Sequence, residues 1–315
     1  LWINLTQGCG AFVCTCLAVY ATTHFLPSLI SDSRNTFFSF VLILGGISVA
    51  TAPAATMAVV HEIRAKGPLT TTLLGVVALD DALSIIIFTG VMTIAGQLAF
   101  GSTASSFLVQ GMMIILGAVA VGFLGGLIFS HVLESSKRPE TNLMLTLGVI
   151  FLVSGLSHTF GFSALLANMT MGFVIANRIK HADDVFHQLD VIEETIFCLF
   201  FTLAAAHFDS KVFLTSFFLG TVLLIGRFIG KIGGTFLGGF ISKASPKVYR
   251  NLGITLLPQA GLSLGLTFLA EPILPSGVFE VLLSAILVST ILNEIISPPL
   301  VKFAIARTGE NNIDR

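Results

Sequence analysis

Ten apolar segments, each of about the length that crosses a lipid bilayer, follow one another along the 315 residues of the chain. A bilayer core about 30 Å thick requires about 20 apolar residues in a helix. Because lipid offers no hydrogen-bonding partner, each segment must satisfy its own backbone groups, as a helix does. We therefore predict an all-α polytopic membrane protein. The expected helices cover residues 3–24, 37–60, 70–96, 105–131, 141–158, 161–178, 190–207, 212–241, 249–270 and 277–304.

The charged residues are few and nearly balanced. The 16 basic and 17 acidic side chains make up 10% of the chain, whereas soluble domains have roughly 25%. They are too few to cover a water-facing surface, and the net charge of −1 provides no basic footprint for nucleic acid. The four cysteines lie inside apolar runs, without the spacing of a metal site or a disulfide framework. We expect no cofactor and no nucleic-acid partner.

The basic residues gather on one side of the predicted topology. When the loops alternate between the two sides, one side receives Arg64, Lys66, Lys137, Arg138, Arg178, Lys180, Lys243, Lys247, Arg250, Lys302, Arg307 and Arg315. The opposite side receives only Arg34 and Lys211, while Arg227 and Lys231 fall inside a span. Because cytoplasmic loops are rich in Lys and Arg, this asymmetry supports the helix count and predicts that both ends lie in the cytoplasm.

A proline interrupts the second predicted helix and another interrupts the ninth. Pro53 lies three residues before Thr56, and Pro258 lies directly before Gln259. Each proline removes a backbone donor inside a span, and a simple kink would explain either one alone. Each of the last three helices comes seven helices after its counterpart among the first three. Successive helices cross the membrane in alternating directions, so an odd offset inverts the second triplet relative to the first. Inverted repeats with two crossed broken helices are typical of secondary transporters, whose ion site lies near the breaks.

Two adjacent carboxylates, Asp80 and Asp81, lie about ten residues into the third predicted helix, near the middle of the bilayer. A charge at that depth costs roughly 2.5–3.5 kcal/mol or more, so a functional site is expected there. Neighbouring side chains point about 100° apart on a helix, which predicts two different roles for the pair. Ser84, one turn later, offers a further oxygen.

The eighth predicted helix supplies opposite charges. Arg227 and Lys231 are four residues apart and share one face, among glycines that allow another helix to approach. Lys231 needs a carboxylate partner, for which an Asp of the third helix is the natural candidate. A Lys can release its proton when it is desolvated, whereas Arg stays charged, so Arg227 is expected to be a permanent structural counter-charge. Glu294 is either a group at the membrane interface or a participant in transport.

These stretches together resemble the monovalent cation:proton antiporter superfamily, in particular its second family of bacterial sodium/proton and potassium/proton antiporters. The resemblance covers essentially the whole chain, and the matching stretches are 51–56, 80–81, 226–231, 257–261 and 293–294. It implies a homodimer in the bacterial inner membrane that works by an elevator movement. It also implies a core formed by residues 1–96 and 212–304, a linking and dimerisation part at 105–207, and a cytoplasmic tail at 305–315.

The resemblance further assigns roles to residues. Asp81 would be the main carboxylate for cation and proton, Asp80 the partner of Lys231, and Thr51 part of the lining of the cation site. The two aspartates would thus hold the monovalent cation. One departure is that a single helix precedes the broken one, which predicts missing N-terminal helices. Another is Gln259-Ala260-Gly261, where some relatives carry a glutamate, so that Glu294 becomes the candidate partner of Arg227.

The leading hypothesis is exchange of sodium, or else lithium or potassium, for protons by competition for one carboxylate. In its electrogenic version two protons move against one cation. A sodium-coupled symporter of organic solutes with a similar inverted repeat is the first rival. An intramembrane aspartyl protease is remote, because its two carboxylates must face each other, and a non-transporting ion sensor is the third rival.

Overall fold

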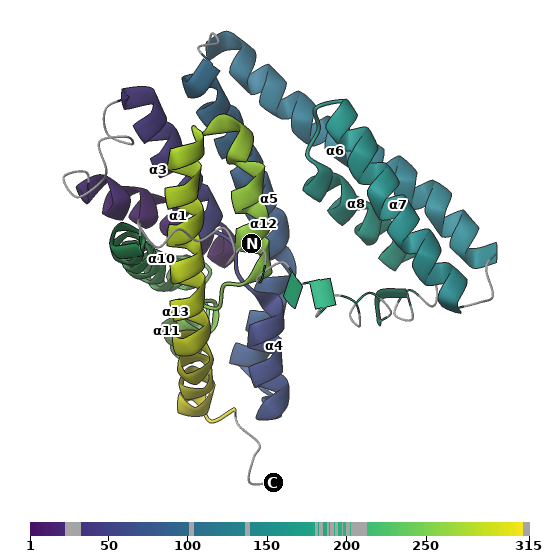
Figure 1. The fold of residues 1–315 in the computed structure, drawn as a ribbon. Coiled ribbons are helices and arrows are strands. Elements are labelled where there is room, and N and C mark those ends of the chain that lie inside the picture. The colour runs from purple at the N-terminus through teal and green to yellow at the C-terminus, as the bar shows by residue number, and fades with distance from the viewer. Residues whose placement is uncertain are drawn as a thin grey trace. The chain divides into compact units, whose positions relative to one another are not determined.

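A computed structural model of the chain describes residues 1–22, 33–100, 104–135, 139–179 and 213–310, together with single positions between 182 and 202. All regular elements in these residues are helices (Figure 1). They form two compact units, the first made of Leu1–Gly101 and Ala204–Arg315, the second of Ser102–Leu203. The first unit contains α1 (Trp2–Ala21), α3 (Arg34–Ser48), α4 (Pro53–Glu62), α5 (Pro68–Phe100), α10 (Phe213–Ile241), α11 (Pro246–Thr255), α12 (Gly261–Leu269), the 3-10 helix η3 (Glu271–Ile273) and α13 (Ser276–Thr308).

The prediction of an all-α membrane protein is confirmed. Six of the described helices, α1, α5, α6, α7, α10 and α13, are long and apolar enough to cross a membrane. The second and ninth predicted helices are each divided into two shorter helices. The seventh, predicted at 190–207, lies largely outside the described residues, as do parts of the basic loops that carry Lys137, Arg138 and Lys180.

The second unit contains α6 (Ala104–Ser135), α7 (Pro139–Thr159) and α8 (Ala164–Arg178). The chain turns between α7 and α8 at Gly161, whose φ of 71° is a left-handed conformation that glycine adopts easily. The hydroxyl of Ser163 then accepts a bond from the backbone N–H of Leu166 and caps α8. The predicted division near residue 160 is therefore confirmed. The role of this unit in dimerisation stays a prediction.

Both proline interruptions are breaks and not kinks. α3 ends at Ser48 and α4 begins at Pro53, and α11 ends at Thr255 before α12 begins at Gly261. Pro53 stands in the first turn of α4, where its missing N–H leaves no helical bond unmade. The two linkers, 49–52 and 256–260, meet through a hydrogen bond of 2.8 Å from the N–H of Ala52 to the carbonyl of Pro258. Two crossed broken helices are thus present, as predicted.

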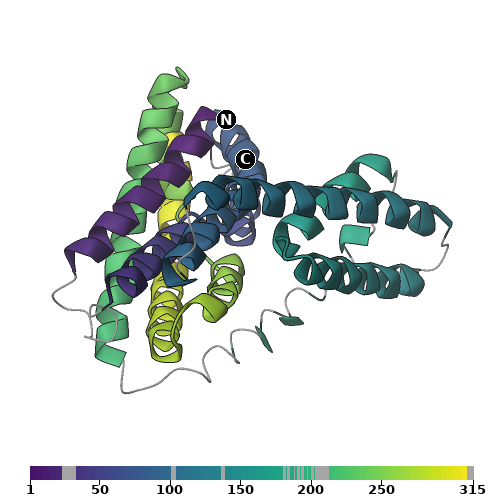
Figure 2. The same cartoon turned by 90° about the horizontal axis from the view of Figure 1, so that it is seen from above.

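Glycines bring α1 and α10 into close contact along their length (Figure 2). A Cβ on Gly230 would lie 2.6 Å from the Cα of Ala11, and one on Gly238 would lie 2.7 Å from the Cα of Ile3. As the residue number rises along α10, the contacted residue number falls along α1, so the two helices are antiparallel. These helices open the two predicted triplets, and an inverted repeat requires this orientation. Small residues allow such backbone approach between membrane helices.

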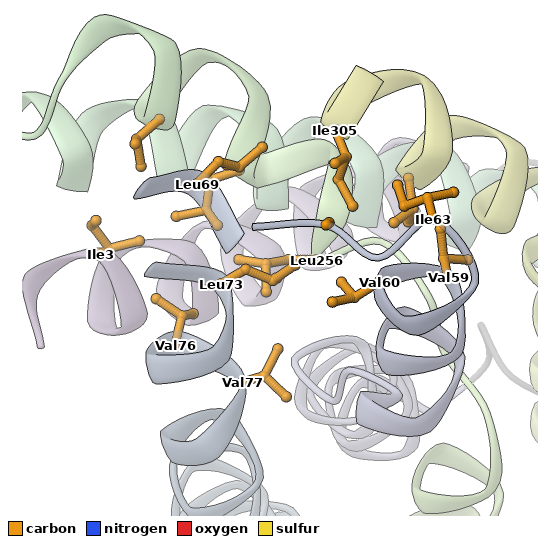
Figure 3. Close-up of a cluster of buried hydrophobic side chains, with 14 residues drawn as sticks. Ile3, Val59, Val60, Ile63, Leu69, Leu73, Val76, Val77, Leu256 and Ile305 are labelled. Carbon is orange, nitrogen blue, oxygen red and sulfur yellow. The ribbon is translucent and has the colours of Figure 1, made fainter. Parts of the chain in front are cut away.

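A hydrophobic cluster joins one end of α4 and α5 to α11 and α13 (Figure 3). Several of its side chains, such as those of Leu69, Leu256 and Ile305, are completely buried. The members are Ile3, Val59, Val60, Ile63, Ala65, Leu69, Leu73, Val76, Val77, Val248, Leu252, Leu256, Val301 and Ile305. Because the cluster includes the first turns of α5, it fixes the start of the helix that carries Asp80 and Asp81.

Glu310 caps α5 beside this cluster. Its carboxylate accepts bonds from the backbone N–H groups of Leu69 and Thr70, at 2.7 and 2.8 Å, and from the hydroxyl of Thr70 at 2.8 Å. The carbonyl of Glu310 accepts a further bond from Lys66 N–H. An anion at a helix N-terminus satisfies free donors and complements the helix dipole. The predicted tail at 305–315 therefore begins inside α13, and Glu310 packs back on the helical unit.

Glu310→Ala is expected to lower the thermal unfolding midpoint of the purified protein in detergent. The change removes a charged acceptor and leaves buried N–H groups of α5 unpaired, a loss of about 2 kcal/mol. The control is Lys302→Ala, which removes an ion pair of 2.8 Å with Glu62 whose side chains are 49% and 61% exposed. Exposed pairs contribute about 1 kcal/mol at most. Equal shifts in the two variants would contradict a special role of Glu310.

Candidate functional site

Arg227 lies between the two breaks and bonds to both. Its guanidinium donates to the carbonyls of Ser48 at 3.0 Å and Ala50 at 2.8 Å on the first linker side. On the second linker it donates to Pro258 at 3.4 Å and to Leu257. The side chain is only 1% exposed. Helix breaks leave carbonyls without intrahelical donors, and one guanidinium has five N–H donors, so Arg227 satisfies acceptors that the breaks release.

The expectation that Glu294 pairs with Arg227 is wrong. Glu294 is exposed on α13, and Arg227 takes backbone carbonyls as partners instead. The neighbouring Asn293 is fully buried and holds the second linker, donating to the carbonyl of Leu257 at 3.0 Å and accepting from the N–H of Gln259 at 3.1 Å. One residue along a helix changes direction by about 100°, and this separates the two side chains.

A buried ion pair lies one helical turn from Arg227 on the same face of α10. Lys231 Nζ lies 3.2 Å from Asp80 Oδ2 and donates to the hydroxyl of Thr51 at 2.6 Å. The side chains of both charged residues are almost completely buried. Thr51 belongs to the first linker, so the pair joins α5 and α10 at the helix break. A buried charge is tolerated in a membrane protein when it is paired in this way.

Sequence reasoning missed the second partner of Asp80. Gln7 of α1 donates its amide to Asp80 Oδ1, and the same nitrogen lies 3.0 Å from Asn4 Oδ1. Both amides are buried, and both occur in an apolar segment at positions three residues apart. Two amides three residues apart in an apolar helix form a polar face, and this face is the signal that the sequence offered, although it does not identify the partner. Asp80 therefore has a partner for each of its oxygens.

Asp81 has a different environment from its neighbour. It is partly exposed, and its Oδ1 is buried without a hydrogen-bond partner in the described part of the chain. The hydroxyl of Ser84 is likewise buried and unpartnered, so the structure bonds it to neither carboxylate. The two carboxylates therefore have different environments: Asp80 is paired with Lys231, and Asp81 retains an oxygen without a partner among the described residues. Their division into two roles stays a prediction.

The remaining predicted residues hold the breaks. Thr56 donates to the carbonyl of Thr255 at 3.2 Å and so links α4 to the end of α11. The Gln259 amide donates to the hydroxyl of Ser263 at 2.7 Å, while its Oε1 has no partner among the described residues. Within the same residues, no group of three or more His, Cys, Asp or Glu gathers as a metal site. The oxygen ligands present suit a hard cation better than a transition metal.

A model of the family described as the transmembrane sodium/hydrogen exchangers matches residues 5–303 of the chain. The chain belongs to the sodium/hydrogen exchanger family. The match includes both breaks, the two aspartates and the basic pair of α10. The resemblance to monovalent cation:proton antiporters is therefore confirmed, and the finer assignment to the second family stays a prediction.

Individual relatives agree with this family. The chain is 23% identical over 204 residues to the Na+/H+ antiporter NhaP of Pseudomonas aeruginosa, a match that covers 61% of this chain and 48% of that protein. The chain thus spans about half the length of this curated relative. A structure of the sodium proton antiporter MjNhaP1 from Methanocaldococcus jannaschii at pH 8 has a TM-score of 0.71 and 20% identity, covering 98% of this chain and 84% of that one.

A second structure of MjNhaP1, an electron-microscopy map, gives a TM-score of 0.64 at 18% identity and covers 97% of this chain and 77% of that chain. At these identities the two structures show a shared fold. The fold of this sodium/hydrogen exchanger family member is therefore that of a polytopic antiporter.

Proposed function

We propose that the protein exchanges a monovalent cation for protons across a membrane, as a secondary transporter with alternating access. One observation carries this function within the family: a buried oxygen of Asp81 has no partner among the described residues, and the adjacent Asp80 is already paired with Lys231. A carboxylate without a fixed partner can bind either a proton or a hard cation. The proposed cation is sodium, with lithium and potassium as the alternatives.

In this mechanism the two ions compete for Asp81. A cation that binds Asp81 displaces its proton on one side, and a proton displaces the cation on the other. Thr51, Ser84 and the carbonyls released by the breaks are proposed to supply further oxygens. In the electrogenic version either Asp80 or Lys231 titrates together with Asp81. Cation binding then releases one proton from each of the two groups, and both groups take up a proton again when the cation leaves, so that two protons move against one cation. No other chemistry is required.

The crossed linkers suit alternating access. Half-helix ends and freed carbonyls near the middle of a membrane form ion sites in inverted-repeat transporters, and one half of such a protein moves against the other. We extend the proposal to an elevator movement, a homodimer and a bacterial inner membrane with both ends of this chain in the cytoplasm. The placement of the two ends rests on the asymmetry of the basic residues, and the other parts rest on the resemblance of the sequence.

The rival functions account for the site less well. A symporter of organic solutes has no need for a buried Asp–Lys pair beside a free carboxylate, and the family match favours proton exchange. A protease dyad needs two carboxylates that share a proton. In the described residues Asp80 faces Lys231 and Gln7 instead, so the proposed activity is transport and not catalysis.

Purified protein in liposomes that contain a pH-sensitive dye should change the internal pH when sodium is added outside. Protons leave the lumen or enter it only if the cation moves in the opposite direction. An imposed potassium diffusion potential should alter the initial rate if exchange is electrogenic. Lithium and potassium are added in parallel to determine selectivity.

Protein-free liposomes provide the control for passive leakage in this experiment. A protein that binds sodium but leaves the internal pH constant would favour the ion sensor. Uptake of labelled solute without proton flux would favour the symporter.

A further inference from the structure

The turn between α4 and α5, residues 63–67, joins the two helices that lead to the candidate ion site. α4 starts directly after the linker that carries Thr51, and α5 carries Asp81 about 20 Å from its own start. Lys231 bonds to Thr51 and to Asp80, so the linker before α4 meets the middle of α5. The position of the turn therefore affects how the oxygens of these two elements are placed relative to each other.

The turn has an uncommon backbone conformation. Arg64 has a φ of 47°, a left-handed value that residues with a side chain adopt rarely. The N–H of Arg64 donates to the carbonyl of His61 at 3.1 Å, and the N–H of Ala65 donates to the carbonyl of Val60 at 3.0 Å. A backbone of this kind persists when contacts from other elements hold it in place.

Glu310, at the end of α13, fits into this turn. The chain reverses after α13 at Gly309, whose φ is 77°, and so places Glu310 back against the helical unit. On the opposite side, a Cβ on Gly67 would lie 2.5 Å from the Cγ of Glu310. Gly67 therefore leaves the space that the glutamate side chain occupies, and both sides of the contact are shaped for it.

Glu310 holds more than the end of one helix. Its carboxylate accepts from the N–H groups of Leu69 and Thr70 in the first turn of α5. Its own carbonyl also accepts from the N–H of Lys66, in the turn, at 3.0 Å. A cap of α5 requires only the first set of bonds. The second fixes the turn itself to the end of α13.

These bonds fix α5 along its axis. The hydrophobic cluster of Figure 3 packs the same region, but apolar contacts are not directional. Hydrogen bonds have a narrow range of lengths and angles and therefore restrict sliding. α5 is one continuous helix without a proline after Pro68, so a displacement of its first turn is transmitted to Asp81.

We propose that Glu310 is a positioning residue for exchange: it holds the α4–α5 turn and the start of α5 to the end of α13, places Asp81 relative to Thr51, and so sets the affinity for the cation. This inference rests on the proposed function. Glu310 touches neither transported ion and acts through α5. Its loss should therefore change the sodium concentration for half-maximal exchange more than the maximal rate.

The first test compares Glu310→Ala with wild type in the dye-loaded liposomes over a series of sodium concentrations at one pH. Initial rates are divided by the amount of monodisperse protein, which removes the effect of lower yield. We expect the half-saturating sodium concentration to rise about tenfold, because groups that orient a metal ligand contribute about 10–100-fold to affinity. Lys302→Ala, which removes the exposed ion pair between α13 and α4, is the matched control and should leave this concentration unchanged.

The second test replaces the carboxylate with a covalent bond. Side chains at positions 67 and 310 are close enough for a disulfide, so Gly67→Cys is combined with Glu310→Cys. The reduced protein should show the raised half-saturating concentration, and oxidation should return it towards the wild-type value. Glu310→Cys alone, treated with the same oxidant, is the control for the four native cysteines and should stay raised.

The outcomes separate positioning from stability. A Glu310→Ala protein with a lower maximal rate and an unchanged half-saturating concentration would show a merely structural role and overturn the inference. An oxidised double variant that stays as impaired as the reduced one would also overturn it.

If Glu310→Ala yields no folded protein, Glu310→Gln is measured instead. Its amide keeps one acceptor oxygen but turns donors towards the N–H groups of α5, so the concentration should still rise. An unchanged value would overturn the inference. Wild-type protein that moves no protons would refute the proposed function and this inference together, whereas wild-type exchange with unaffected Glu310 variants would refute the positioning role alone.

Discussion

Asp81→Asn is expected to reduce sodium-dependent proton movement in liposomes to the level of protein-free vesicles. Asparagine keeps the size of the side chain but can neither take up a proton nor offer a negative charge to a cation. Asp80 cannot replace it, because both of its oxygens already accept bonds from Gln7 and Lys231. The measurement is the dye signal after sodium addition at several pH values.

The fold of this variant should survive. A buried carboxylate oxygen without a partner is costly in a membrane protein, so neutralising it should leave the thermal unfolding midpoint unchanged or raise it. Asp81→Glu is the matched control, since it keeps a titratable carboxylate at the same position and should retain part of the exchange. If Asp81→Asn vesicles still changed pH on sodium addition, the assignment of the carrier carboxylate would be wrong.

The bounds of the long helices could be predicted from the sequence, because the bilayer thickness determines their length and polar residues mark their ends. The predicted 70–96 and 212–241 became α5 and α10 with shifts of a few residues. Pro53 and Pro258 indicated the breaks for a local reason, the loss of a backbone donor. The pairing of Lys231 with an Asp of α5 also followed, because a lysine inside a span needs a carboxylate partner and this helix carries two.

The errors and omissions arise from contacts that join distant segments. A buried arginine was expected to need a counter-charge, but Arg227 uses carbonyls that become free only when two linkers cross. We predicted a role for Glu294 because its side chain is ionisable, and we predicted none for the neighbouring Asn293. Adjacent residues on a helix point about 100° apart, so Glu294 is exposed whereas Asn293 is buried. Gln7 has its partner 73 residues away, and the spacing along one helix cannot reveal such a contact.

Arg227→Met is expected to cause a large loss of stability, with little folded protein recovered and a strongly lowered unfolding midpoint. The change leaves carbonyls of both linkers buried and unpaired. Each such group costs about 1–3 kcal/mol, and the sum is of the order of the total stability of many proteins, about 5–15 kcal/mol. The measurements are the yield of monodisperse protein and its thermal unfolding in detergent.

Arg227→Lys separates charge from hydrogen bonding. Lysine keeps the positive charge but has three donors on one nitrogen, so it cannot reach carbonyls on both linkers as the planar guanidinium does. We expect a stability between those of Arg227→Met and wild type. Arg250→Gln, at an exposed arginine of α11, is the control for loss of an arginine and should change little. A lysine variant as stable as wild type would show that the charge alone matters, as a structural counter-charge. Clear destabilisation would mean that the guanidinium joins the two broken helices through their carbonyls.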